Sequence, residues 1–108
     1  MKEIIEFIEV AMTGEPVPIQ ELLAVSGLPA DELQVLIDFG VVAPLAEGER
    51  AGFFPGGAVL VVRRAARLRR DFDLSADSLA LVMALLERIE ATEAQLRELE
   101  CQLLRGDV

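Results

Sequence analysis

The last third of the chain carries a heptad pattern of apolar positions. From Val82 onward apolar side chains recur every three or four residues, and Thr92 holds the one polar position of the series. The apolar members of this seam are Val82, Leu85, Ile89, Leu96, Leu99 and Leu103. Such spacing is typical of helices that pack side by side in a coiled coil. Because Ser75 can cap the start and Gly106 can stop the end, the pattern predicts one long helix.

A helix of about thirty residues would be about 45 Å long, since each residue adds 1.5 Å. A small domain before it is too short to cover that length, so part of the helix needs a partner. One interpretation is homodimerisation through the seam. The other is that only the first half packs on the preceding domain and the end stays exposed.

Two short helical patterns lie near the start of the chain. Pro18 can hold the first helical position of one pattern, which ends at Ser26 and Gly27, and a second runs from Pro29 to Gly40. The positions that we expect to be buried are Ile19, Leu22, Leu23, Leu33, Leu36 and Ile37. Two helices about four residues apart, with a glycine in the turn, are typical of a helix-turn-helix.

The segments around this motif are shorter and less regular. Residues 3–12 are compatible with either a helix or a strand, because their apolar positions fit both periods imperfectly. We expect a short strand over residues 41–44. The glycine-rich segment 47–57, which contains Phe53 and Phe54, indicates a loop or a small β-wing.

Residues 58–72 predict a third helix with two different faces. The positions that we expect to face the core are Val61, Ala65, Leu68 and Phe72. Arg63, Arg67 and Arg70 form the opposite stripe, with Arg64 beside it. We therefore divide the chain into a helix-turn-helix-like domain over residues 1–74 and a long helix for packing and dimerisation over residues 75–108.

Composition excludes several classes of function. The 108 residues include no histidine and one cysteine, Cys101. We find no glycine-rich phosphate loop, nucleophile–base pair or metal-ligand set in the sequence, so we expect neither an enzyme nor a bound cofactor. No apolar run is long enough for a membrane span, and the start does not resemble a signal peptide, so we expect a cytoplasmic protein.

The net charge of −9 is concentrated in the first 60 residues, where ten acids face only Lys2 and Arg50. Such a balance disfavours nucleic acid and favours a basic protein surface. The expected outward positions of the second helix are Asp31, Glu32, Gln34, Val35 and Asp38, and Glu21 of the first helix can join them. They form either a solvated face or an acidic patch for a basic partner.

The sequence of these parts resembles a known family. Three segments show the resemblance. They are residues 19–44, which end in FGVVAP; the triplet Arg67-Leu68-Arg69; and the LALV sequence at residues 79–82, which begins the charged helix. Together they resemble the CbpM family of chaperone modulators, within the MerR-like group of winged helix-turn-helix proteins. The resemblance implies a mainly α fold with a small β-wing and a long coiled-coil helix, and it favours a strand for residues 4–10.

The resemblance also implies a function. CbpM-like proteins bind the J-domain of CbpA, a DnaJ-like co-chaperone, and restrain both its stimulation of DnaK and its binding to DNA. The residues to which we assign this contact are Glu21, Asp31, Glu32, Gln34, Val35 and Asp38. The alternative is a MerR-like transcriptional regulator that contacts DNA through Arg63, Arg64, Arg67 and Arg70.

Overall fold

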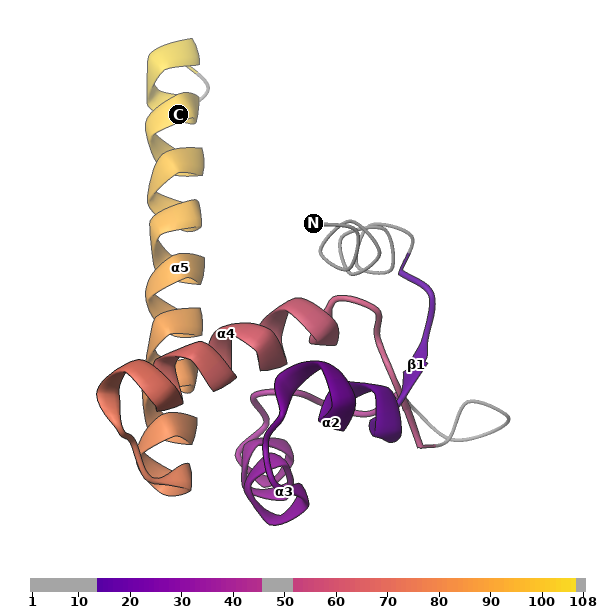
Figure 1. The fold of residues 1–108 in the computed structure, drawn as a ribbon. Coiled ribbons are helices and arrows are strands. Elements are labelled where there is room, and N and C mark those ends of the chain that lie inside the picture. Colours follow the sequence, from indigo (N-terminus) through magenta and orange to yellow (C-terminus); the bar gives the residue numbers. More distant parts are fainter. Residues whose placement is uncertain (1–13, 46–51, 107–108) are drawn as a thin grey trace.

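The computed structural model describes residues 14–45 and 52–106. In chain order the elements are β1 (Val17–Pro18), α2 (Ile19–Ser26), α3 (Ala30–Asp38), β2 (Phe53–Phe54), α4 (Ala58–Phe72) and α5 (Ala76–Arg105). Figure 1 shows α2, α3 and α4 gathered into a small domain from which α5 projects as a long rod. The mainly α, winged helix-turn-helix class is confirmed. The strand expected at residues 4–10 lies outside the described residues.

The turn between α2 and α3 is closed by local hydrogen bonds. Gly27 adopts a left-handed backbone with φ of 70°, and its N–H donates to the Leu23 carbonyl at 2.9 Å. A residue with a Cβ would be strained in that conformation. The Ser26 hydroxyl accepts a hydrogen bond from the Leu28 N–H at 3.2 Å, which helps to hold the buried Leu28 side chain in the core.

A two-stranded antiparallel sheet forms the wing. Val17 pairs with Phe54 and Pro18 with Phe53, and the buried Val17 and Phe54 side chains join the core. Pro18 is therefore extended, with ψ of 161°, and precedes α2 instead of opening it. Because β1 leads directly into α2 and β2 comes shortly before α4, the sheet fixes the starts of these two helices relative to each other.

The strand predicted over residues 41–44 does not form. The chain leaves α3 through Gly40, with φ of 79°, and the Val41 N–H donates to the Leu36 carbonyl at 2.9 Å. This bond satisfies a carbonyl at the end of the helix, and Val42 is buried in the core. The apolar residues of this segment thus serve a helix end, which their composition alone cannot distinguish from a strand.

The core lies where α2 packs on α4 and α3 packs on α5. Its largest fully buried side chains are Leu22, Leu33, Leu36, Val59, Val62 and Leu79. Burial of each such side chain contributes about 1.5–3 kcal/mol relative to exposure. Of the positions that we expected to be buried, Leu22, Leu33 and Leu36 are confirmed, and the other three are only partly buried against the core: Ile19, Leu23 and Ile37.

The buried face of α4 differs from the predicted one. Val59 and Val62 are buried together with Ala65, whereas Val61 and Leu68 are only partly covered and Phe72 is 68% exposed. Phe72 is the last helical residue before the chain turns through Asp73, which has a left-handed φ of 50°. The helix therefore ends before α5 can cover this ring.

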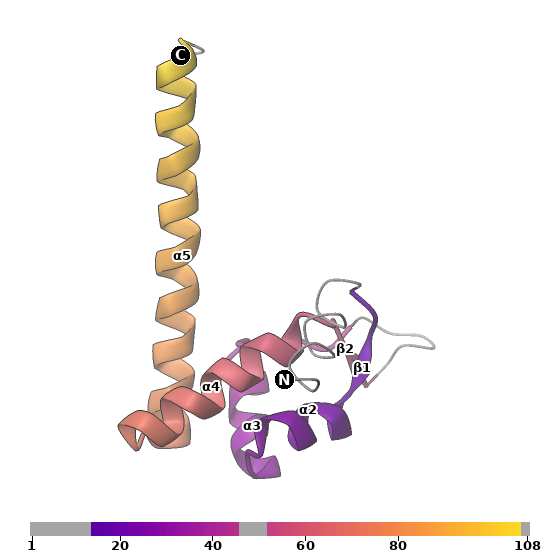
Figure 2. The same cartoon turned by 45° about the horizontal axis from the view of Figure 1, so that its top comes forward.

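Helix α5 begins and ends where the sequence predicts. The Ser75 side chain accepts a hydrogen bond from the Ser78 N–H at 3.2 Å, and Gly106 ends the helix with φ of 74°. Leu79, Ala80 and Met83 are buried, but from residue 87 to residue 106 every residue except the half-buried Gln102 is exposed. Figure 2 shows this half of the helix standing clear of the domain. In the described part of the chain, no helix has the length and apolar character that crossing a membrane requires.

Replacing the cap tests how α5 starts. We expect Ser75→Ala to lower the free energy of unfolding by about 1 kcal/mol, because it leaves the Ser78 N–H without its acceptor. Thermal denaturation followed by circular dichroism would measure the change. Ser78→Ala is the control, since it keeps the backbone donor and the cap and removes only the hydrogen bond that the Ser75 hydroxyl donates to the Ser78 hydroxyl at 2.9 Å, so we expect a smaller loss. An equal loss in both variants would contradict the capping role.

Candidate partner-binding surfaces

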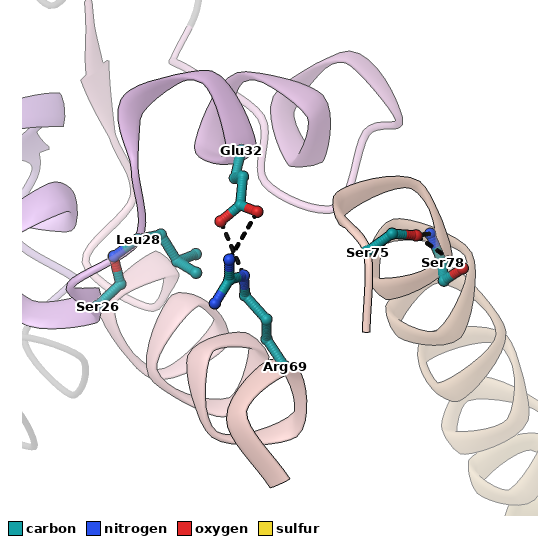
Figure 3. A network of polar contacts seen from close by, with 6 residues as sticks. All are labelled: Ser26, Leu28, Glu32, Arg69, Ser75 and Ser78. Carbon is teal, nitrogen blue, oxygen red and sulfur yellow. Dashed lines mark hydrogen bonds and ion pairs between the residues drawn. The ribbon is translucent and has the colours of Figure 1, made fainter. Parts of the chain in front are cut away.

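An ion pair joins α3 to α4. The Arg69 Nη2 donates to Glu32 Oε1 at 2.8 Å, and Arg69 Nε lies 2.8 Å from Glu32 Oε2 in a contact that is charged but not well aligned as a hydrogen bond (Figure 3). A hydrogen bond between a guanidinium and a carboxylate is charge-assisted and stronger than one between neutral groups. The Glu32 side chain is only 17% exposed. The expectation that Glu32 points outward is therefore wrong, because the fold itself uses its charge.

The remaining acidic residues of α3 do face solvent. Asp31, Gln34 and Asp38 are exposed, and the Gln34 Nε2 donates to Asp38 Oδ1 at 2.9 Å one turn further along. Val35 is half-buried and packs against the core, so it adds little to the surface. We refer to Asp31, Gln34 and Asp38 as the acidic face of α3.

The charge around this face is uniformly negative on its own helices. Residues 14–45 hold five acids and neither lysine nor arginine. Glu21 is exposed on α2, and Phe39, which follows the acidic face at the end of α3, is 53% exposed. The surface thus offers carboxylates beside an aromatic ring, which is suited to a basic partner with an apolar contact.

The arginines of α4 meet at a cleft. Its volume is about 510 Å³, and it is lined by Val25 and Ser26 of α2 and, from α4, by Leu60, Arg63, Arg64, Ala66, Arg67 and Arg70. The structure therefore brings together all four arginines that we considered as DNA contacts. The sequence predicts their common face on one helix, but it gives no sign that the end of α2 forms the opposite wall.

Two of these arginines contact acids. Arg64 Nη1 lies 2.9 Å from Glu90 Oε1 and links α4 to α5, while Arg70 Nε is 3.7 Å from Asp71 Oδ1. These side chains are substantially exposed, so each pair contributes under about 1 kcal/mol. The contacts compensate part of the positive charge of the cleft.

The seam of α5 has little cover. Leu85, Ile89, Leu96, Leu99 and Leu103 are 50–65% exposed, whereas Val82 is half-buried near the domain. The Thr92 hydroxyl donates to the Arg88 carbonyl at 2.8 Å within the same helix. Because this hydroxyl is already satisfied, Thr92 can face an apolar surface without losing a hydrogen bond.

Comparison with known proteins places the chain in a family. The family model described as MerR HTH family regulatory protein matches residues 17–101. The chaperone modulatory protein CbpM of Escherichia coli (strain K12 / DH10B) is 31% identical over 87 residues, which are 81% of this chain and 86% of the relative. CbpM proteins of Escherichia coli O157:H7 (strain EC4115 / EHEC) and Shigella boydii serotype 18 (strain CDC 3083-94 / BS512) match to the same extent. The chain belongs to the CbpM family.

This membership covers the surfaces described above. The MerR-like match begins at β1 and ends within α5, so it includes the acidic face, the arginine cleft and most of the seam. The names of both groups denote regulatory or modulatory proteins. Neither family name, however, identifies the side chains that contact a partner.

The Glu32–Arg69 pair was not found from the sequence, because its members are 37 residues apart. The sequence contains one weak signal for this pair. Residues 14–45 include neither lysine nor arginine, so an acid that becomes covered there needs a cation from elsewhere in the chain. Five arginines between Arg63 and Arg70 are the nearest group of cations along the chain.

A double-mutant cycle would measure this pair. We expect Glu32→Gln and Arg69→Gln each to destabilise the protein and to show a coupling energy of about 1–2 kcal/mol in urea unfolding, because the two changes remove one interaction. Arg64→Gln with Glu90→Gln is the matched exposed pair and should couple by under about 1 kcal/mol. Additive effects at Glu32 and Arg69 would contradict a structural role for the pair.

Proposed function

We propose that the protein is a chaperone modulator that binds the J-domain of a DnaJ/CbpA-like co-chaperone. Binding would inhibit the stimulation of DnaK by the co-chaperone and its binding to DNA. The proposal takes the chaperone role from the name of the relatives, chaperone modulatory protein CbpM. The contact surface is inferred from this chain, and the observation that carries it is the acidic face of α3.

The position of that face supports a protein partner. Helix α3 is the second helix of the helix-turn-helix, the element that DNA-binding relatives of this fold insert into the major groove. Here its exposed polar positions are Asp31, Gln34 and Asp38. Carboxylates beside phosphates would be repelled and would release no counterions. A basic protein helix, by contrast, would be attracted by the same carboxylates.

The mechanism that we infer is occlusion. Asp31 and Asp38, with Glu21 of α2, would attract the basic J-domain helix that otherwise contacts DnaK, and Phe39 would add an apolar anchor at the edge. Such rim charges mainly set the association rate and specificity. A half-exposed aromatic ring is the kind of side chain that contributes binding energy once it is buried.

A second candidate function is DNA binding as a MerR-like transcriptional regulator. It is favoured by one observation, the convergence of Arg63, Arg64, Arg67 and Arg70 on one cleft. DNA binding would require the arginines and would be weakened by the acidic face, whereas J-domain binding would require the acidic face. Comparing the two classes of variant therefore separates the functions.

We also propose that a second copy of the chain covers the seam of α5. Five apolar side chains in a heptad series are half exposed along a helix of 30 residues, and the domain reaches only its first turns. Two such seams can cover each other in a coiled coil. This dimer would present two acidic faces in one assembly.

Calorimetric titration of an isolated J-domain from the same organism tests the co-chaperone proposal. We expect saturable binding that weakens with added salt, and Asp31→Lys should weaken it roughly tenfold, or about 1.4 kcal/mol. Glu98→Lys makes the same charge change on α5, where the contact of Glu98 with Arg105 is long at 3.9 Å, and should leave the affinity unchanged. Tight, salt-sensitive binding to duplex DNA without J-domain binding would favour the regulator instead.

Sedimentation equilibrium tests the dimer. We expect Ile89→Asp to halve the mass of the assembly, because it places a charge in the centre of the seam. Leu104→Asp is the matched control, since Leu104 is 88% exposed and lies outside the heptad series. A wild-type protein that sediments as a monomer at all concentrations would exclude the dimer.

A further inference from the structure

We propose that the cleft between α2 and α4 is a second docking site, which binds an acidic protein segment that carries an apolar side chain. This site has the opposite charge from the acidic face of α3. It is therefore independent of the proposed J-domain contact, and the protein could engage two different surfaces of its partners.

The spacing of the arginines gives the cleft its line of charge. Arg63, Arg67 and Arg70 recur every three or four residues, so their side chains follow one side of α4 over about 10 Å. This length matches a few residues of an extended or helical peptide. Guanidinium groups can each donate two hydrogen bonds to one carboxylate, which makes acidic side chains suitable ligands.

The charge of the cleft is partly compensated from outside its lining, because Arg64 pairs with Glu90 of α5 at 2.9 Å and Arg63 also has a contact partner. Within the described residues no carboxylate belongs to the lining, and Arg67 has no ion-pair partner in that part of the chain. Arg70 contacts Asp71 only at 3.7 Å, with both side chains more than half exposed. Positive charge therefore remains at Arg67 and Arg70, in a chain whose net charge is −9.

The cleft also has an apolar part. Leu60 is 46% exposed, and its neighbours in the lining include Val25 of α2 and Ala66 of α4. An apolar side chain of the ligand would remove Leu60 from water while flanking carboxylates reach the arginines. Phosphodiester backbones offer charge but no apolar group for this position.

A nucleic acid fits the cleft less well for a second reason. A duplex carries phosphates continuously along its length, well beyond the reach of three arginines on one helix. Its flanking phosphates would meet a protein surface with a net negative charge. A short acidic segment places its charge only where the cleft is positive.

Fluorescence anisotropy with a short labelled peptide of glutamate and leucine tests the site on the full chain. We expect saturable binding that Arg67→Glu weakens at least tenfold, because it puts a carboxylate in the middle of the arginine line. Arg97→Glu makes the same change on the exposed surface of α5, away from the cleft, and should leave the affinity unchanged. A leucine-free peptide of equal charge should bind more weakly, and Leu60→Ser should abolish that difference.

Three outcomes would overturn the proposal: no binding of the peptide by the wild-type chain, equal weakening by Arg67→Glu and Arg97→Glu, or a preference for duplex DNA of the same length at equal salt. Circular dichroism of both variants excludes unfolding as the cause of a loss. Asp31→Lys should not weaken peptide binding and Arg67→Glu should not weaken J-domain binding, so failure of one proposal is distinguishable from failure of the other.

Discussion

Burial of one narrow face of α4 is the constraint on which the rest of the structure depends. Val59, Val62 and Ala65 are almost completely covered, and α2 packs directly on this helix. Small and β-branched side chains at these positions allow the helices to approach closely. Once that face is buried, Arg63, Arg67 and Arg70 line the cleft, whereas Arg69, which follows Ala65 by four residues, stays beside the buried face and reaches Glu32.

Two arginines of α4 connect it to different helices. Arg69 reaches back to Glu32 and fixes α3 against α4, while Arg64 contacts Glu90 and links α4 to α5. Because Glu32 is neutralised inside the fold, the exposed charge of α3 is left to Asp31 and Asp38. The same helix that completes the core therefore also determines which acids are available to a partner.

This arrangement gives a helix-turn-helix fold a surface unlike that of a DNA reader. The fold positions α3 for recognition, but the side chains that it presents are acidic, and the basic groups lie on another helix beside α2. Membership of the CbpM family agrees with a regulatory role, and our proposal of a protein partner rests on this charge pattern. The exposed seam of α5 adds a third surface, which is apolar and uncharged along its centre.

Local signals in the sequence were sufficient for most of the elements. The heptad series and the Ser75 and Gly106 caps predicted α5, and Gly27 together with Pro29 predicted the break between α2 and α3. These features act over one or two turns of chain, so they can be recognised without knowledge of distant contacts. The strand predicted over residues 41–44 was wrong for the same reason, because a short apolar segment fits the end of a helix as well as a strand.

Only the tertiary structure decided which faces are used. The sequence by itself determined that α3 is acidic, that α4 carries a stripe of arginines and that α5 has an apolar seam. It did not determine that Glu32 is held by Arg69, that Phe72 stays exposed or that α2 closes one side of a cleft. Those outcomes depend on how helices far apart in the chain are rotated against one another, and that rotation is set by packing of the whole core.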